Sequence, residues 1–191
     1  DDSEVIEVDQ LNISGNVSIE ILNDVSVTVK NLVRLKGAGV VSVNVPSGGR
    51  FTVNGFAEGC ADDWLRINGK RAWISNDGTV FALDEKPNDR TVAARGDVIP
   101  DAPADVVGIV SEGDASAGNT TLEKDTTSVF ALNHETAADA TVDIAEGLIL
   151  KANLIRVKSG AGNLSLGDVQ GQGAVSAESG VFETRVDDAD S

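Results

Sequence analysis

The sequence predicts an all-β protein of the antiparallel β-sandwich or jelly-roll type, with an internally duplicated strand-turn-strand unit. Apolar and polar residues alternate along most of the 191-residue chain, as in strands with one solvated face. The chain has 5 Phe, 2 Trp and no Tyr or Met, so its apolar residues are mainly aliphatic, and β-branched side chains favour sheets. Asn-Gly and Asp-Gly pairs between the alternating segments favour tight hairpins.

The first half of the chain is a series of short alternating or apolar segments, each of a length typical of strands. Turn pairs such as Asn54-Gly55, Asn68-Gly69 and Asp77-Gly78 follow some of them. We expect strands at 5–8, 17–21, 25–29, 32–35, 40–45, 51–53, 65–67, 72–74 and 80–83. They form a first β module, residues 1–86, whose N-terminal strand is available for exchange with a neighbouring subunit.

The pattern changes in residues 87–105, where Pro87, Pro100 and Pro103 interrupt the alternation. Pro cannot donate to a strand ladder, so this segment is expected to be a linker or a long surface loop. A second β module, residues 106–191, follows. Its strands are expected at 106–110, 128–132, 141–144, 148–150, 154–157, 164–166, 174–177 and 181–186. The Ala-rich segment 135–145 lacks an apolar stripe, which favours a loop leading into a strand over a helix.

The most informative pattern is a duplication. Residues 31–39 read NLVRLKGAG and residues 153–162 read NLIRVKSGAG. The match continues downstream into 41–43 and 164–166, and the letters VFAL occur at both 80–83 and 129–132. Gly-Ala-Gly is typical of a turn where larger side chains do not fit. We interpret the match as two homologous strand-turn-strand units, in one sandwich or in two.

The duplicated segments carry the same cations, Arg34 and Lys36 in the first copy and Arg156 and Lys158 in the second. Charged residues of a strand usually lie on its solvated face. The alternative is that these four side chains contact an acidic neighbour, such as a second copy of this chain.

Composition excludes several classes of protein. Acidic residues number 31 against 15 Lys and Arg, a net charge of −16, so neither nucleic acid nor an anionic membrane surface is an expected partner. Without a run of 18 apolar residues, membrane insertion is not expected either. Cys60 is the only cysteine, which excludes a disulfide within the chain. A chain that starts at Asp1 without Met favours a processed, exported protein, or a chain trimmed to its ordered part.

The sequence contains no recognisable catalytic machinery. His134 is the only histidine, it lies in a polar stretch typical of a surface, and no G-x-S-x-G or Walker A sequence occurs. We therefore expect no enzyme, no catalytic residues and no cofactor. Acidic clusters could attract Ca²⁺, but no EF-hand loop supports a calcium site, so metal ligands stay unassigned.

Three functional hypotheses follow. The favoured one is a non-enzymatic subunit that assembles with itself, by strand exchange, into an extracellular or cell-surface filament, pilus-like fibre or surface layer, with Val5, Ile6 and Val8 at the subunit interface. The alternatives are a virion capsid or decoration protein, and a module that binds carbohydrate or another surface ligand through Trp64 or Trp73. In an exported protein, four Asn-X-Ser/Thr sequons could carry glycans: Asn12, Asn16, Asn119 and Asn163.

Overall fold

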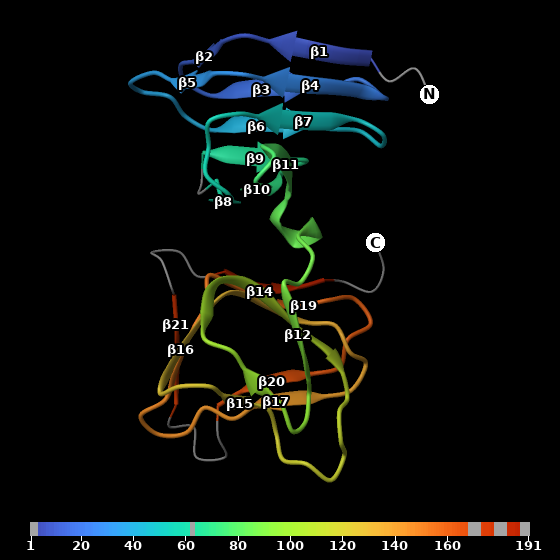
Figure 1. The fold of residues 1–191 in the computed structure, drawn as a ribbon, viewed down its shortest axis with the longest axis vertical. Coiled ribbons are helices and arrows are strands. Elements are labelled where there is room, and N and C mark those ends of the chain that lie inside the picture. The colour runs from blue at the N-terminus through green and yellow to red at the C-terminus, as the bar shows by residue number, and fades with distance from the viewer. Residues whose placement is uncertain (1–3, 62–63, 168–172, 178–182, 188–191) are drawn as a thin grey trace. The chain divides into compact units, whose positions relative to one another are not determined.

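The computed structural model describes residues 4–61, 64–167, 173–177 and 183–187, and these are almost entirely strand and turn (Figure 1). The only helix in this part of the chain is one 3-10 turn, Leu83–Glu85. The prediction of an all-β protein is confirmed. The prediction of an antiparallel sandwich or jelly roll is wrong, because most strands pair in parallel and stack as the coils of a β-solenoid. The chain divides into two compact units, Asp1–Lys86 and Pro87–Ser191.

The first unit contains three stacked coils. The first coil consists of β1 (Glu4–Val8), β2 (Leu11–Ile13) and β3 (Val17–Glu20). The second consists of β4 (Val25–Val29), β5 (Leu32–Arg34) and β6 (Val41–Asn44), and the third of β7 (Arg50–Val53), β8 (Gly59–Cys60) and β9 (Leu65–Ile67). Parallel pairing runs through β1–β4–β7, β2–β5 and β3–β6–β9, which gives the solenoid three faces.

An antiparallel hairpin ends the first unit. It consists of β10 (Lys70–Ile74) and β11 (Thr79–Ala82), which pair with each other. β10 also pairs with β9, and β11 with β7, so the hairpin occupies the edges that a further coil would use. The β9–β10 turn has positive φ angles at Asn68 (50°) and Gly69 (78°), the conformation for which Asn-Gly is favoured.

Apolar and polar residues alternate along the strands, so the apolar side of a strand faces the interior of the coils. In β6, Val41 and Val43 are fully buried while Ser42 between them is half-buried, and the same order holds for Leu65, Arg66 and Ile67 in β9. Apolar residues of successive coils therefore stack on one another to form the core of the unit.

The second unit is also a solenoid with parallel strands. One row of paired strands contains β12 (Arg90–Ala93), β14 (Ala102–Ser111), β16 (Thr126–His134), β19 (Leu154–Val157) and β22 (Glu183–Val186). The first part of β16 pairs instead with β18 (Ile149–Lys151), and β18 pairs with β21 (Ala174–Ser176). Shorter pairs complete the coils: β13 (Val98–Ile99) with β15 (Thr121–Leu122), and β17 (Ala140–Val142) with β20 (Leu164–Leu166).

The sequence makes a specific prediction for two segments of this unit. Residues 87–105, expected as a linker or long loop, contain β12, β13 and the start of β14. Pro103 lies in β14 within its register irregularity between Ala102 and Val106, where the ladder is interrupted. Residues 135–145 form no helix and lead into β17, as expected.

The duplicated segments occupy corresponding places in the two units. Residues 31–39 provide β5 and the turn before β6, and residues 153–162 provide β19 and the turn before β20. The two VFAL segments do not correspond, because 80–82 lies in β11 of the antiparallel hairpin and 129–132 in the parallel strand β16. The duplication is therefore a match between solenoid coils, not between hairpins of a sandwich.

Candidate functional site

The outer edge of the first coil is the surface with the clearest capacity for interaction. Among the described strands, β1, β2 and β3 pair on one side only, with β4, β5 and β6. Their other side presents backbone N–H and C=O groups that another strand could pair with. Val5 is 65% exposed and Ile6 42%, whereas Val8 is half-buried against the core. The predicted interface residues Val5, Ile6 and Val8 thus lie together on β1.

Charge at this edge is acidic. The described part of the first coil and of the turn after it, residues 4–24, contains Glu4, Glu7, Asp9, Glu20 and Asp24 and no Lys or Arg. Lys30, at the end of β4, forms ion pairs with Glu7 (2.9 Å) and Asp9 (3.1 Å). Hydrogen bonds to Glu7 and Asp9 raise the pKa of Lys30 above its usual value. The second coil therefore supplies the cation that holds these two carboxylates of the first.

A second edge lies at the last described coil. β21 pairs only with β18, and β22 only with β19, among the strands that the structure describes. Val175 in β21 is 38% exposed and Val186 in β22 is 73% exposed. Half of the large apolar side chains that are exposed in the described part of the chain thus belong to β1, β21 and β22, the strands of the two terminal edges.

The four cations of the duplicated segments are divided between the two units. Arg34 lies 5.0 Å from the ring centroid of Trp64, and its Nη2 donates to the carbonyls of Ala38 and Gly39 at 3.3 and 3.2 Å. Lys36 is exposed in the turn after β5.

The other two cations make contacts within the second unit. Arg156 forms an ion pair with Asp187, in which the Arg side chain is only 11% exposed, and Lys158 pairs with Glu135. Arg156 Nε donates a hydrogen bond to Asp187 Oδ2, with a donor–acceptor distance of 2.8 Å. Because these partners lie on neighbouring coils, the two cations connect coils of one chain.

Three of the four sequon asparagines take part in contacts between successive coils. Asn16 Oδ1 accepts a 3.0 Å hydrogen bond from Val40 N, Asn119 Nδ2 donates to Asp143 Oδ1 at 2.9 Å, and Asn163 Nδ2 donates to Asp139 Oδ1 at 3.1 Å. Each pair is 24 residues apart, which is one coil. Asn12 is exposed in β2 and accepts only a local bond, from Gln10 (2.8 Å). Glycosylation of these asparagines stays a prediction.

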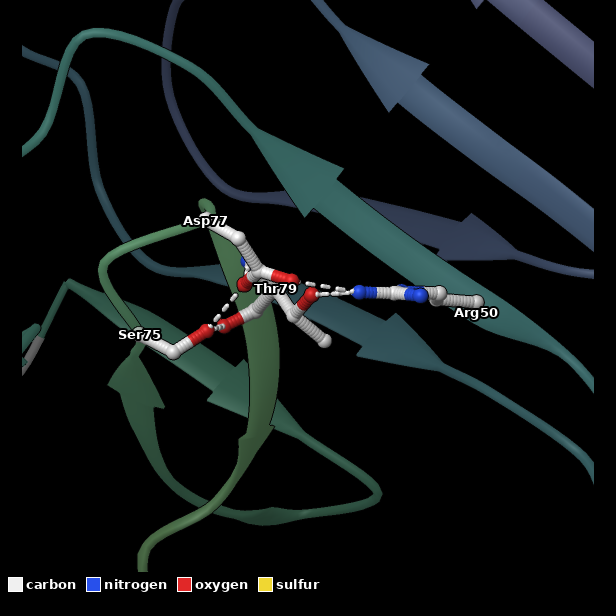
Figure 2. A network of polar contacts seen from close by, with 4 residues as sticks. All are labelled: Arg50, Ser75, Asp77 and Thr79. Atoms are coloured by element: carbon white, nitrogen blue, oxygen red, sulfur yellow. Dashed lines mark hydrogen bonds and ion pairs between the residues drawn. The ribbon is translucent and has the colours of Figure 1, made fainter.

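A polar network lies beside a hollow on the first unit. Figure 2 shows Arg50 of β7 reaching Asp77 (Nη2–Oδ2 2.7 Å) and Thr79 of the hairpin, while Ser75 donates to Asp77 Oδ1 at 2.5 Å. Hydrogen bonds from Ser75 and Thr79 hold the pKa of Asp77 well below its usual range. The adjoining hollow of about 360 Å³ includes Pro46, Asn68, Phe81 and Glu85 in its lining. The network joins the hairpin to the third coil.

The histidine and the two tryptophans are buried or partly buried. His134, expected at the surface, is fully buried in β16, and its Nε2 lies 3.0 Å from the carbonyl of Ala138. Trp73 is 4% exposed with Lys86 over its ring. Trp64 is half-buried, between Arg34 and a tilted Phe56 ring at 5.3 Å. Each ring thus has a cationic side chain over it, Arg34 over Trp64 and Lys86 over Trp73.

The described residues also contain no group of three or more His, Cys, Asp or Glu side chains placed to hold a metal ion. No helix in this part of the chain is long and apolar enough to cross a membrane. Comparison with protein families, curated proteins and solved structures finds no match to this chain.

Proposed function

We propose that this chain is a non-enzymatic structural subunit that assembles with copies of itself by adding solenoid to solenoid, as an extracellular or cell-surface filament, fibre or layer. The observation that carries the proposal is the edge of the first coil, which pairs on one side only among the described strands and on which Val5 is 65% and Ile6 42% exposed. A parallel strand of another copy placed on this edge would form the same backbone hydrogen bonds that β4 forms with β1.

The two ends of the first unit support this use of β1. Its far end is covered by the antiparallel hairpin, so a further parallel coil cannot be added there. Its first coil has no such hairpin among the described residues. Natural sheets usually protect edge strands with charge or a covering segment. Here Glu4 and Glu7 supply charge, while Ile6 points to the same side of the sheet as Val27, with which it pairs in register, and remains half exposed.

Sedimentation velocity over a range of concentrations tests the proposal. The wild-type chain is expected to form species whose size increases with concentration. Ile6→Lys should weaken self-association at least about tenfold, or roughly 1.4 kcal/mol, because it places an unpaired charge in the new contact. Val110→Lys is the matched control. Val110 is 41% exposed on β14, which has strand neighbours on both sides, and the change in charge is the same.

Two results would count against the proposal. One is a wild-type chain that stays monomeric at every concentration and salt level. The other is equal weakening of association by Ile6→Lys and Val110→Lys, because that would assign the effect to charge and not to the first-coil edge.

A further inference from the structure

Three pairs in this chain place glycine directly after asparagine or aspartate, and all three lie in the first unit: Asn54-Gly55, Asn68-Gly69 and Asp77-Gly78. Such pairs share a spontaneous reaction, in which the backbone nitrogen of the glycine attacks the side-chain carbonyl carbon of the residue before it. Glycine permits this approach because it has no Cβ. Asparagine is accordingly among the thermolabile residues of proteins. The structure holds the three side chains to different degrees, which separates one pair from the other two.

The Asn68 side chain is held by a neighbouring coil. Its Oδ1 accepts a 2.7 Å hydrogen bond from the backbone N–H of Val45, and its own backbone N–H donates to the carbonyl of Val43 at 2.8 Å. Asn68 and Gly69 are also the two central residues of the tight turn between the paired strands β9 and β10. Attack by Gly69 N would require the side chain to leave Val45 and the turn to change its conformation, so this pair is protected.

The Asp77 side chain is held by its own hairpin (Figure 2). Its Oδ1 accepts hydrogen bonds from Ser75 Oγ at 2.5 Å and from Thr79 N at 3.0 Å, and its Oδ2 pairs with Arg50 at 2.7 Å. These hydrogen bonds hold the pKa of Asp77 below its usual range, so the carboxyl is ionised near neutral pH. A nitrogen nucleophile attacks a negatively charged carboxylate far more slowly than a neutral amide. This pair is therefore protected as well.

Asn54 lacks both kinds of restraint. It follows β7 in the loop of residues 54–58, which precedes β8, and both Asn54 and Gly55 are exposed. The backbone N–H of Asn54 donates to Val29 O at 3.0 Å, but its side chain and the backbone nitrogen of Gly55 form no hydrogen bond within the part of the chain that the structure describes. Gly55 has a φ angle of 84°, and apart from its two chain neighbours no described residue comes within 4 Å of the position that a Cβ would take. The attacking nitrogen and the amide are therefore both free to move.

We propose that Asn54 is a site of spontaneous deamidation in the folded chain, and that Asn68 and Asp77 are protected from the corresponding reaction. The proton of the Gly55 N–H passes through water to Nδ2 of Asn54, the Gly55 nitrogen bonds to Cγ, and the Cγ–Nδ2 bond breaks to release ammonia. Water then opens the resulting succinimide. Opening at the side-chain carbonyl gives aspartate, and opening at the backbone carbonyl gives isoaspartate. The chain gains one negative charge in either case.

The folded first unit accommodates both products. Isoaspartate adds one methylene to the backbone after the Cα of residue 54. The hydrogen bond from the backbone N–H of this residue to Val29 O lies before that point, and the added length falls in the loop and not in β7 or β8. The proposal is independent of self-assembly, since residues 54–58 lie outside the strands of the first coil.

Peptide mapping of the aged protein tests the proposal. The folded wild-type chain is incubated at mildly alkaline pH, which promotes loss of the glycine N–H proton, and is then digested at acidic pH. Mass spectrometry with electron-transfer fragmentation separates isoaspartate from aspartate in the peptides. Asn54 should convert at least about tenfold faster than Asn68, because the Asn68 side chain must first lose its hydrogen bond. In urea neither side chain is held, so the two rates should agree within about threefold.

Asn54→Gln keeps an amide at this position but removes the asparagine that closes the five-membered ring. It should remove most of the ammonia that the folded chain releases. Asn12→Gln is the matched control, because Asn12 is also exposed but precedes the β-branched Ile13, and it should leave the release unchanged. Equal conversion of Asn54 and Asn68 in the folded chain would overturn the proposal, as would an Asn54 that stays intact when folded and converts in urea. Both outcomes leave the self-assembly proposal standing.

Discussion

The side-chain oxygen of Asn16 accepts a 3.0 Å hydrogen bond from the backbone N–H of Val40, one coil further along the chain. The second unit repeats the arrangement, with Asp139 Oδ1 accepting from Asn163 N at 2.8 Å. Both accepting side chains come from the preceding coil, and both N–H groups directly follow the Gly-Ala-Gly of the duplicated segment. Both copies of the duplicated segment therefore contain a turn whose backbone N–H is held by a side chain of the preceding coil.

Removing the Asn16 side chain should destabilise the first unit. Asn16→Ala leaves Val40 N without its partner, and we expect a loss of about 1 kcal/mol in the free energy of unfolding. Asn12→Ala is the matched control, because Asn12 accepts only a local bond and its loss should change stability by a few tenths of a kcal/mol at most. Both Trp residues lie in the first unit, so urea unfolding followed by Trp fluorescence reports on it. Equal effects of the two changes would contradict the role given to Asn16.

The two glycines at these turns should differ in their tolerance of alanine. A Cβ at Gly39 would lie 1.9 Å from Asn16 Oδ1, which can rotate away, whereas a Cβ at Gly162 would lie 2.7 Å from the Ala138 backbone carbon, which cannot. We expect about 1–2 kcal/mol for Gly39→Ala and about 3 kcal/mol for Gly162→Ala. Asn16→Ala combined with Gly39→Ala should cost little more than Gly39→Ala alone, since both remove the same hydrogen bond.

Unfolding measurements check this comparison, with Trp fluorescence for the first unit and the change in circular dichroism for the second. A smaller loss for Gly162→Ala than for Gly39→Ala, or full additivity of the Asn16 and Gly39 changes, would contradict the close approach of these coils.

The stability of the second unit should fall at acidic pH through Glu135. Burial raises the pKa of this carboxyl, but hydrogen bonds from Lys158 and Asn88 and the nearby positive charges outweigh it, so the pKa lies below its usual value of 4.5. The folded state thus favours the ionised form. Its contribution is present above about pH 4.5 and is lost as the pH falls through the lower pKa of the folded state.

Glu135→Gln should therefore lower stability at pH 7 by about 1 kcal/mol or less and should flatten its dependence on pH below about 5. Circular dichroism follows the unfolding of both units, whereas Trp fluorescence follows only the first. The circular dichroism change that fluorescence does not report, measured from pH 3 to pH 7, therefore gives the pH dependence of the stability of the second unit. An unchanged slope in the variant would show that the Lys158–Glu135 pair does not stabilise the fold.

Self-association should strengthen with salt. Each copy carries a net charge of −16, and all charged residues of the described first coil are acidic. Two copies therefore repel each other at long range. The Debye length falls from about 30 Å at 0.01 M salt to about 10 Å at 0.1 M. The association constant from sedimentation should therefore rise over this range. A fall with salt would indicate contacts held by exposed ion pairs and not by strand pairing and apolar burial.

Much of the strand content could be predicted from the sequence, but not the direction of pairing. Alternation identifies 25–29 and a short apolar run identifies 154–157, with the bounds seen for β4 and β19. A period of two is the same in parallel and antiparallel strands, so it does not separate a solenoid from a sandwich. The Asn-Gly and Asp-Gly pairs do mark hairpins at Asn68-Gly69 and Asp77-Gly78, but only in the antiparallel end of the first unit.

One signal could have indicated the solenoid. Val17-Ser18-Ile19, Val41-Ser42-Val43 and Leu65-Arg66-Ile67 recur at the 24-residue spacing of one coil, and repeats of this length are typical of solenoids. The longer match between 31–39 and 153–162 spans several coils and so suggested two modules. The contacts of Arg156 and Lys158 with acids of neighbouring coils could not be predicted without knowing which residues stack.

Electron microscopy of the wild-type chain at high concentration and at 0.1 M salt or above tests self-assembly through the first-coil edge most directly. We predict polymers that lengthen with concentration, are lost in Ile6→Lys and persist in Val110→Lys. Single particles of one chain under all of these conditions, or polymers that persist unchanged in Ile6→Lys, would contradict it.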